Sequence, residues 1–330
     1  MKLLVLLSSM LLLITGCSQD SISLLSPDGT NSFVVLPSST EDSSGGISFL
    51  VKSNGKTIIQ PSVLKILSSD LGFKGGYKVL KVEKSSIENQ WSTRFGELST
   101  VPDNYNQATI YLDYQGSKLN LIIRAYNEGV AFSYEIPKQQ GLGEIEIDDE
   151  LISYRFDSDY SVWSTPKREP GKLTAQGEYR KIPLSKLEHG AERPLVIEMK
   201  NGLVMALAEA RLVDYARLSF NSDPNAELAI LSSLDGKVIG SVQDVITGAQ
   251  KSNRSNNAKI KMSLPFKSPW RVVMIANDYA KLLEQNYLIQ NLNDPSKIKD
   301  DSWIVLRKST ERKHIDHSRW ARRRRFCCRT

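Results

Sequence analysis

The chain has 330 residues, and 43 Lys and Arg against 37 Asp and Glu give it a formal net charge of +6. Its three Cys exclude a disulfide framework, and its length supports a large hydrophobic core. Residues 304–330 hold ten Lys and Arg against two acids, so they carry 10 − 2 = +8 and the rest carries 6 − 8 = −2. The body is therefore mildly acidic, and its composition excludes a nucleic-acid binder driven by overall charge.

Residues 1–16 have the layout of a secretory signal peptide. Lys2 precedes an apolar run over residues 3–14 that is too short to span a bilayer, and Gly16 precedes Cys17. Ile-Thr-Gly-Cys resembles a bacterial lipobox, in which the Cys is acylated and becomes the new N-terminus. The alternative is an ordinary signal peptide that happens to contain a Cys. We expect an exported lipoprotein, periplasmic or at the cell surface, that is anchored to the membrane through Cys17.

Residues 23–274 follow the pattern of short β-strands separated by tight turns. Apolar and polar residues mostly alternate, as in residues 118–126, which is typical of a sheet with one covered face. Asn54-Gly55 is the residue pair of a tight hairpin turn. The expected strands lie within residues 32–37, 46–62, 76–88, 108–137 and 193–212. This plan predicts a mainly β fold, a large sandwich of two antiparallel sheets.

Helical spacing appears only near the end of the body. A strand over residues 271–276 leads into residues 278–292, whose apolar residues recur with helical periodicity. Asp278 is a suitable N-cap, and Asp294-Pro295 a stop signal. The sequence therefore predicts one short C-terminal helix after the sandwich.

The body resembles the N-terminal domain of glycoside hydrolase family 97. Each matching segment is short, and the resemblance depends on their order and spacing over about 280 residues. The segments are SPDG (26–29), IIQPSVL (58–64), IIRAYNEGVAFSYEIP (122–137), LAEARLVDY (207–215), SPWRVVMIA (268–276), LIQNLN (288–293) and DDSWI (300–304). The resemblance assigns residues 23–303 to this domain, a β-super-sandwich.

The resemblance also implies an activity. Family members are inverting α-glucosidases or retaining α-galactosidases, typically of Gram-negative bacteria, and a (β/α)8 barrel after the sandwich carries their catalytic carboxylates. Such a barrel needs about 250 residues, and only 26 follow Ile304. We therefore expect a truncated member with no catalytic residues and no hydrolase activity of its own. The alternative is a stand-alone glycan-binding lipoprotein that holds an oligosaccharide without catalysis.

Glycoside hydrolysis needs two carboxyl groups across the scissile bond, and no pair in this sequence is distinguished as one. The densest acidic cluster is EIEIDDE, residues 144–150. Glu144, Glu146 and Asp148 alternate along one side of a strand. We interpret them as a solvated face rather than a catalytic one.

Glu209 is the one candidate metal ligand. By the resemblance, a glutamate of the sandwich joins calcium in the barrel's active site, and Glu209 matches its segment. Alternation with Met205 and Leu207 places Glu209 on an apolar side, where a carboxylate needs a cation. The alternative is a salt bridge to Arg211, Arg217 or another nearby cation. We expect no calcium to bind stably here, because the barrel's ligands are absent.

Tryptophan can stack on sugar rings, but in a β-rich chain it more often packs in the core. The candidates are Trp91, Trp163, Trp270 and Trp303. Trp270 is expected to be structural, whereas Trp303 lies where the barrel would dock and is expected to be exposed. His189 has no recognisable catalytic partner, and no phosphate-binding loop or zinc spacing occurs.

The basic end, residues 304–330, contains His314, His317, Cys327 and Cys328 beside four consecutive arginines, residues 322–325. These residue types suggest a nucleic-acid arm, a metal site or a redox pair. Their enrichment starts where the family resemblance stops, as out-of-frame translation would produce. We expect a disordered basic tail without function or nucleic-acid partner. The hypothesis is a frameshift near codon 304, and the nucleotide sequence downstream, read in all frames, tests it.

Overall fold

The computed structural model describes residues 21–36, 46–73, 76–93, 96–166, 177–187, 190–234, 237–243, 250–255, 260–298, 300 and 303. The signal peptide, Cys17, His189 and the basic end lie outside the described residues. The chain divides into two compact units, one of Met1–Ser92 with Thr100–Asp294 and one of Thr93–Ser99 with Pro295–Thr330. All described strands and helices belong to the first unit. No helix of the described part is long and apolar enough to cross a membrane.

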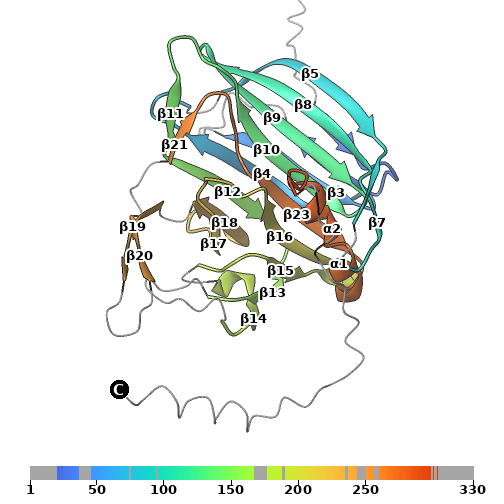
Figure 1. The fold of residues 1–330 in the computed structure, drawn as a ribbon. Coiled ribbons are helices and arrows are strands. Elements are labelled where there is room, and N and C mark those ends of the chain that lie inside the picture. Colours follow the sequence, from blue (N-terminus) through green and yellow to red (C-terminus); the bar gives the residue numbers. More distant parts are fainter. Residues whose placement is uncertain are drawn as a thin grey trace, which may run out of the picture. The chain divides into compact units, whose positions relative to one another are not determined.

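Two large antiparallel sheets form the first unit (Figure 1). The smaller has the strand order β1 (Ile22–Leu25), β2 (Asn31–Val35), β3 (Ile47–Ser53), β4 (Lys56–Leu67), β12 (Asp149–Arg155), β18 (Ala229–Leu234) and β17 (Leu218–Ser222). The larger runs β14 (Arg180–Pro183), β13 (Ser161–Ser164), β15 (Leu195–Glu198), β16 (Val204–Ala210), β23 (Trp270–Ala276), β10 (Gly129–Ile136), β9 (Ser117–Tyr126), β8 (Tyr105–Tyr114) and β5 (Lys78–Ile87), with β22 (Phe266–Lys267) paired to β10.

Short elements complete this unit. The two-stranded pairs are β11 (Glu144–Ile147) with β21 (Ile260–Ser263), β19 (Lys237–Gln243) with β20 (Gln250–Ser255), and β6 (Gln90–Ser92) with β7 (Thr100–Pro102). The 3₁₀ turns are η1 (Leu184–Lys186) and η2 (Lys200–Gly202), and the helices are α1 (Tyr279–Glu284) and α2 (Tyr287–Asn291). The predicted mainly β, antiparallel sandwich is confirmed.

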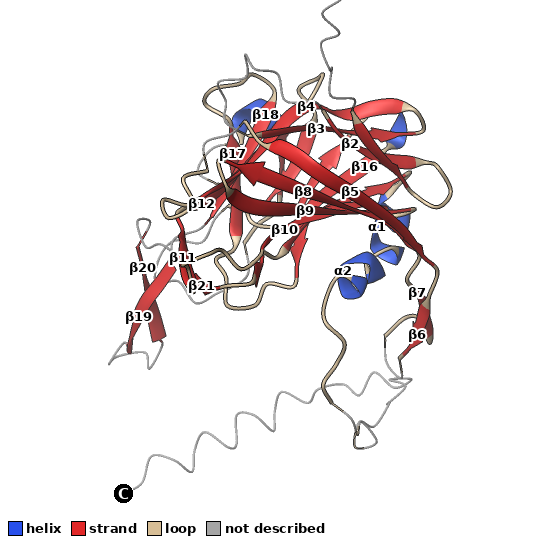
Figure 2. Ribbon diagram, turned by 90° about the horizontal axis from the view of Figure 1, so that it is seen from above, coloured by secondary structure: helices blue, strands red, loops and turns tan. Residues whose placement is uncertain are grey.

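Alternation along the strands fills the core between the two sheets. In β16, Met205 and Leu207 point into this core, while Val204 and Ala206 lie in a second apolar cluster. That second cluster includes Leu282, Leu288 and Leu292 from and beside the two helices. The helices therefore cover the outer face of the larger sheet (Figure 2). As a result, β23 is buried at every position.

Local signals account for the turns and the helix start. Asn54 and Gly55 join β3 to β4 with φ of 49° and 73°, as the hairpin prediction requires. The Asp278 side chain caps α1 by accepting a hydrogen bond from the Lys281 N–H at 2.7 Å. Two short helices, α1 and α2, form where a single helix was predicted, and Gln285 and Asn286 lie between them.

Candidate functional site

Three charged side chains point into the core from two sheets. Glu209 on β16 lies opposite Arg271 on β23 in the strand register, so both occupy the same face of the larger sheet. This is the face predicted for Glu209 from its alternation with Met205 and Leu207. Glu150 begins the inward series of β12 and approaches from the smaller sheet. The charges thus meet inside the sandwich.

Arg271 connects the two sheets through paired hydrogen bonds. Its Nε donates to Glu150 Oε1 at 2.6 Å and its Nη2 donates to Glu150 Oε2 at 2.5 Å. Its Nη1 donates to Glu209 Oε2 at 2.7 Å. The side chains of Arg271 and Glu150 are both 0% exposed. Tyr215 adds a hydroxyl donor to Glu150 Oε2 at 3.2 Å, so both Glu150 oxygens are satisfied.

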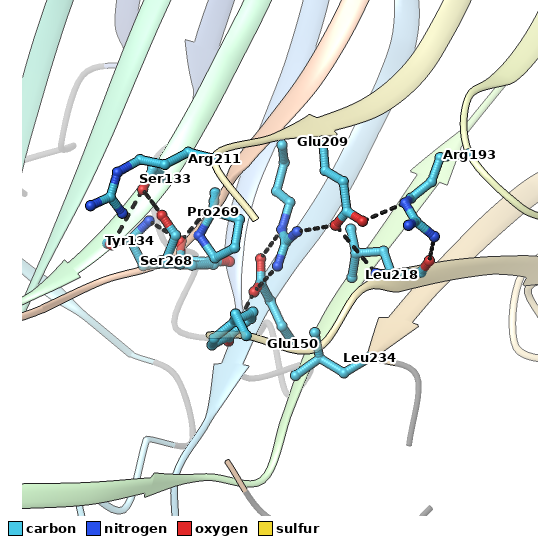
Figure 3. Close-up of polar contacts among 12 residues, drawn as sticks. Ser133, Tyr134, Glu150, Arg193, Glu209, Arg211, Leu218, Leu234, Ser268 and Pro269 are labelled. Atoms are coloured by element: carbon cyan, nitrogen blue, oxygen red, sulfur yellow. Dashed lines mark hydrogen bonds and ion pairs between the residues drawn. The ribbon is translucent and has the colours of Figure 1, made fainter. Parts of the chain in front are cut away.

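Arg193 binds Glu209 from the other side (Figure 3). Its Nε forms an ion pair with Glu209 Oε1, without a well-aligned hydrogen bond. The backbone N–H of Leu218 donates to Glu209 Oε2 at 3.2 Å. Both oxygens of this nearly buried carboxylate therefore already have positive or donor partners.

The pKa shifts follow from this arrangement. Burial lowers the pKa of Arg271, but the Glu150 and Glu209 carboxylates and Tyr215 together raise it above its usual value, so the guanidinium stays charged. Burial raises the pKa of Glu209, and Arg271 and Arg193 oppose that rise without cancelling it. The pKa of Arg271 and the pKa of Glu209 can both be raised, because Arg271 makes two hydrogen bonds to Glu150 and only one to Glu209.

The cations proposed as alternative partners of Glu209 are engaged elsewhere. Arg211 Nε pairs with Asp294 at 3.0 Å, and Arg217 Nη1 pairs with Glu192 at 2.9 Å. The nearby cations that pair with Glu209 are instead Arg271 and Arg193. Calcium requires about six to eight oxygen ligands, and the described residues contain no group of three or more His, Cys, Asp or Glu that could hold a metal ion. The surroundings of Glu209 fit an ion pair and do not fit calcium.

The acidic cluster divides as its alternation predicts. Glu144 and Asp148 are exposed and Glu146 is half-buried, whereas Ile145 and Ile147 between them are buried. Glu146 lies 3.5 Å from Lys261 on the paired strand. The solvated-face interpretation holds for these three acids. Glu150, at the end of the same segment, is the exception, and its burial was not predicted.

Three of the four candidate tryptophans lie apart from any cluster of aromatic and charged side chains that includes Trp163. Trp270 is buried, as expected, and its ring lies 4.8 Å from the Arg124 guanidinium. Trp91 donates its indole N–H to Asn291 Oδ1 at 2.8 Å, beside α2. Trp303 is 68% exposed, in line with the expectation, and donates to the Asp300 carbonyl at 3.1 Å.

Trp163 belongs to a partly exposed aromatic and charged cluster on β13, β14, β15 and α1. Its indole N–H donates to Glu198 Oε1 at 3.1 Å and to the Tyr279 hydroxyl at 2.9 Å. Glu198 also accepts hydrogen bonds from Lys181 and the Tyr279 hydroxyl, and these contacts lower its pKa to about 2. Tyr279 is 43% exposed. An aromatic surface beside a fixed carboxylate can contact a sugar ring and its hydroxyl groups.

Comparison with known proteins identifies the family. The family model described as glycosyl-hydrolase 97 N-terminal matches residues 24–295. This chain belongs to glycoside hydrolase family 97. A family 97 enzyme from Pseudoalteromonas sp. strain K8, solved in complex with acarbose, is similar with a TM-score of 0.70 and 28% identity over 86% of this chain and 39% of its own. A β-arabinopyranosidase shares the fold, with a TM-score of 0.66, at 19% identity, over 78% of this chain and 40% of its own.

A curated relative is a probable retaining α-galactosidase from Streptomyces bingchenggensis strain BCW-1. It is 21% identical over 261 residues, which are 79% of this chain and 36% of that protein. The chain therefore spans about two fifths of the length of the relatives it matches. What the comparisons establish is the family and its N-terminal sandwich.

Sequence reasoning found Glu209 but missed its partners in this family 97 domain. Arg271 carries the clearest signal, because an Arg inside the apolar run WRVVMIA must be buried and must face a carboxylate. Glu150 and Arg193 carry no such signal, since each lies beside other charged residues. Their roles depend on the packing of the two sheets.

The first prediction concerns the buried ion pair. Arg271→Met should lower the free energy of unfolding by about 3–5 kcal/mol, because it leaves the buried Glu150 without a cation. Glu150→Met combined with Arg271→Met should recover much of this loss, since no buried charge then remains on that pair. Urea denaturation monitored by circular dichroism measures both.

Lys81→Met is the control, because its ion pair with Glu83 is exposed and its loss should change stability little. Equal losses in the single and double variants would show that the loss does not come from an unpaired charge on Glu150.

Proposed function

We propose that this domain acts as the non-catalytic sandwich of an α-glycoside hydrolase whose substrates are oligosaccharides. Membership of family 97 over residues 24–295 is the observation that carries the proposal. Two solved structures of the Pseudoalteromonas enzyme, named as complexes with acarbose and panose, support an oligosaccharide substrate. The catalytic carboxylates would come from the (β/α)8 barrel that the family resemblance implies.

The charge network supports a non-catalytic role for the sandwich. A glycosidase needs one carboxyl group that donates a proton and a second that acts as base or nucleophile. Glu150 and Glu209 are the most buried carboxylates described, and arginines bind both. A carboxylate held by guanidinium groups in the core can neither reach a glycosidic oxygen nor activate a water molecule. These two acids therefore stabilise the domain.

The second prediction follows for the purified chain. It should release no nitrophenol from p-nitrophenyl α-glucoside or α-galactoside above the blank, because Glu150 and Glu209 are ion-paired and the family resemblance places the catalytic carboxylates in the barrel. The Streptomyces relative, named a probable retaining α-galactosidase, serves as the positive control for the α-galactoside. Turnover that persists in Glu150→Gln and Glu209→Gln would mean that other residues of this chain are catalytic.

A second candidate function is glycan binding without hydrolysis. The cluster of Trp163, Tyr279 and Glu198 favours it, because it combines exposed aromatic surface with a carboxylate that remains ionised at neutral pH. Lys181 fixes this carboxylate and lies 5.8 Å from the Trp163 ring centre. This arrangement offers an apolar sugar face and hydrogen-bonding groups at one place.

The third prediction tests this surface. Calorimetric titration with malto-oligosaccharides should detect binding, and Trp163→Ala should weaken it by about tenfold, which corresponds to about 1.4 kcal/mol. Trp303→Ala is the control, because Trp303 is more exposed but is not part of the cluster. Absence of binding, or equal weakening by both variants, would remove this function.

We also propose that the domain is exported and lipid-anchored through Cys17, which lies outside the described residues. The motif Ile-Thr-Gly-Cys after an apolar run supports this. The fourth prediction is that cells grown with an alkyne fatty acid label the wild-type chain and leave Cys17→Ser unlabelled. Cys327→Ser is the matched control and should be labelled as the wild type is. Label on Cys17→Ser, or none on the wild type, would contradict the anchor.

A further inference from the structure

The carboxylate of Glu209 lies where the family resemblance implies a calcium ligand, yet its two oxygens contact protein groups. Oε2 accepts hydrogen bonds from Arg271 at 2.7 Å and from the Leu218 N–H at 3.2 Å, and Oε1 faces Arg193. We propose that Arg193 is a built-in counter-ion of Glu209 that occupies the position of an external cation. The sandwich therefore folds and fixes Glu209 without calcium. This inference does not depend on the proposed hydrolase role.

Contacts on three sides hold Arg193 in this position. Its Nη1 donates to the Leu218 carbonyl at 3.0 Å and to Glu192 Oε2 at 3.2 Å, while its Nε faces Glu209. Leu218 thus accepts a hydrogen bond from Arg193 and donates one to Glu209. The guanidinium and the carboxylate are both tied to the first residue of β17, which fixes their separation.

The charge balance of the cluster leaves no place for a divalent cation. Glu150, Glu209 and Glu192 contribute three negative charges, and Arg271, Arg193 and Arg217 contribute three positive charges. An added calcium ion would leave an excess of two positive charges inside the sandwich, where uncompensated charge is costly. Calcium can bind Glu209 only if an arginine leaves.

Of the two arginines, Arg193 is the one that an external cation would displace. The Arg271 side chain is 0% exposed and bonded to Glu150 through two nitrogens, whereas the Arg193 side chain is 19% exposed. The exposed side of Glu209 is therefore the side that Arg193 covers. A cation from solvent and the Arg193 guanidinium compete for the same oxygen, Oε1.

The fifth prediction begins with the full wild-type chain. Its Tm should be the same within about 1 °C in 5 mM CaCl2 and in EDTA, because the counter-ion is already present. A calcium-dependent rise in the wild-type Tm would overturn the proposal. This arm requires no variant, so it remains decisive even if a substitution prevents folding.

Variants then separate charge from shape. In EDTA, Arg193→Ala should lower the Tm by at least about 5 °C, and Arg193→Lys should lower it less, because it keeps a cation. Adding Glu209→Gln to Arg193→Ala should restore much of the loss. Arg180→Ala is the control, because Arg180 is exposed and lies 3.8 Å from the exposed Glu178.

Calcium addition to the same variants tests the competition. Without the guanidinium, the oxygens that Arg193 contacts, Glu209 Oε1, Glu192 Oε2 and the Leu218 carbonyl, are left to bind a cation together with water. Millimolar CaCl2 should therefore raise the Tm of Arg193→Ala and leave that of Arg193→Ala/Glu209→Gln unchanged. If the single variant shows no calcium response, or if both variants respond equally, the guanidinium does not occupy a cation position at Glu209 and the proposal fails.

Discussion

The Arg271 guanidinium, buried between Glu150 and Glu209, is the constraint on which the sandwich depends. A fully buried charge costs several kcal/mol unless its hydrogen-bonding groups are matched. Here Nε, Nη1 and Nη2 of Arg271 all donate to carboxylate oxygens. Glu150 belongs to one sheet and Arg271 to the other, so these hydrogen bonds connect the two sheets at a defined position. Apolar contacts are not directional and define the relative position of two sheets less strictly.

The same constraint decides which acids are available for chemistry. A catalytic or metal-binding carboxylate needs an oxygen directed at the ligand. Glu150 directs both of its oxygens at Arg271, and Glu209 is shared between Arg271 and Arg193. Glu150 and Glu209 therefore hold the domain together through ion pairs and are not available to bind a ligand. By contrast, Glu198 lies on the outer face of the unit beside exposed aromatic surface, where a ligand could reach it.

The features predicted from the sequence are those that depend on neighbouring residues, such as strand alternation and turn pairs. Strand alternation and the Asn54-Gly55 pair predicted antiparallel sheets, and alternation along β16 predicted the inward face of Glu209. Its partners could not be predicted in the same way, because Arg271 is 62 residues from Glu209 and 121 from Glu150. Only the packing of the sheets brings them together. The C-terminal segment forms two short helices instead of the one predicted, with α1 against β16 and β23 and α2 against β16.

The backbone that follows Glu209 contains two residues in the left-handed conformation, close to the charge network. Arg211 and Asp214 adopt left-handed conformations with φ of 56° and 49°, which cost free energy for residues other than glycine. The Arg211 N–H donates to Asn293 Oδ1 at 2.9 Å, and its side chain pairs with Asp294. Contacts at the end of α2 thus hold one strained residue. Leu218, which begins β17 at the end of this segment, donates its N–H to Glu209, so the turn connects the strained residues to the charge network.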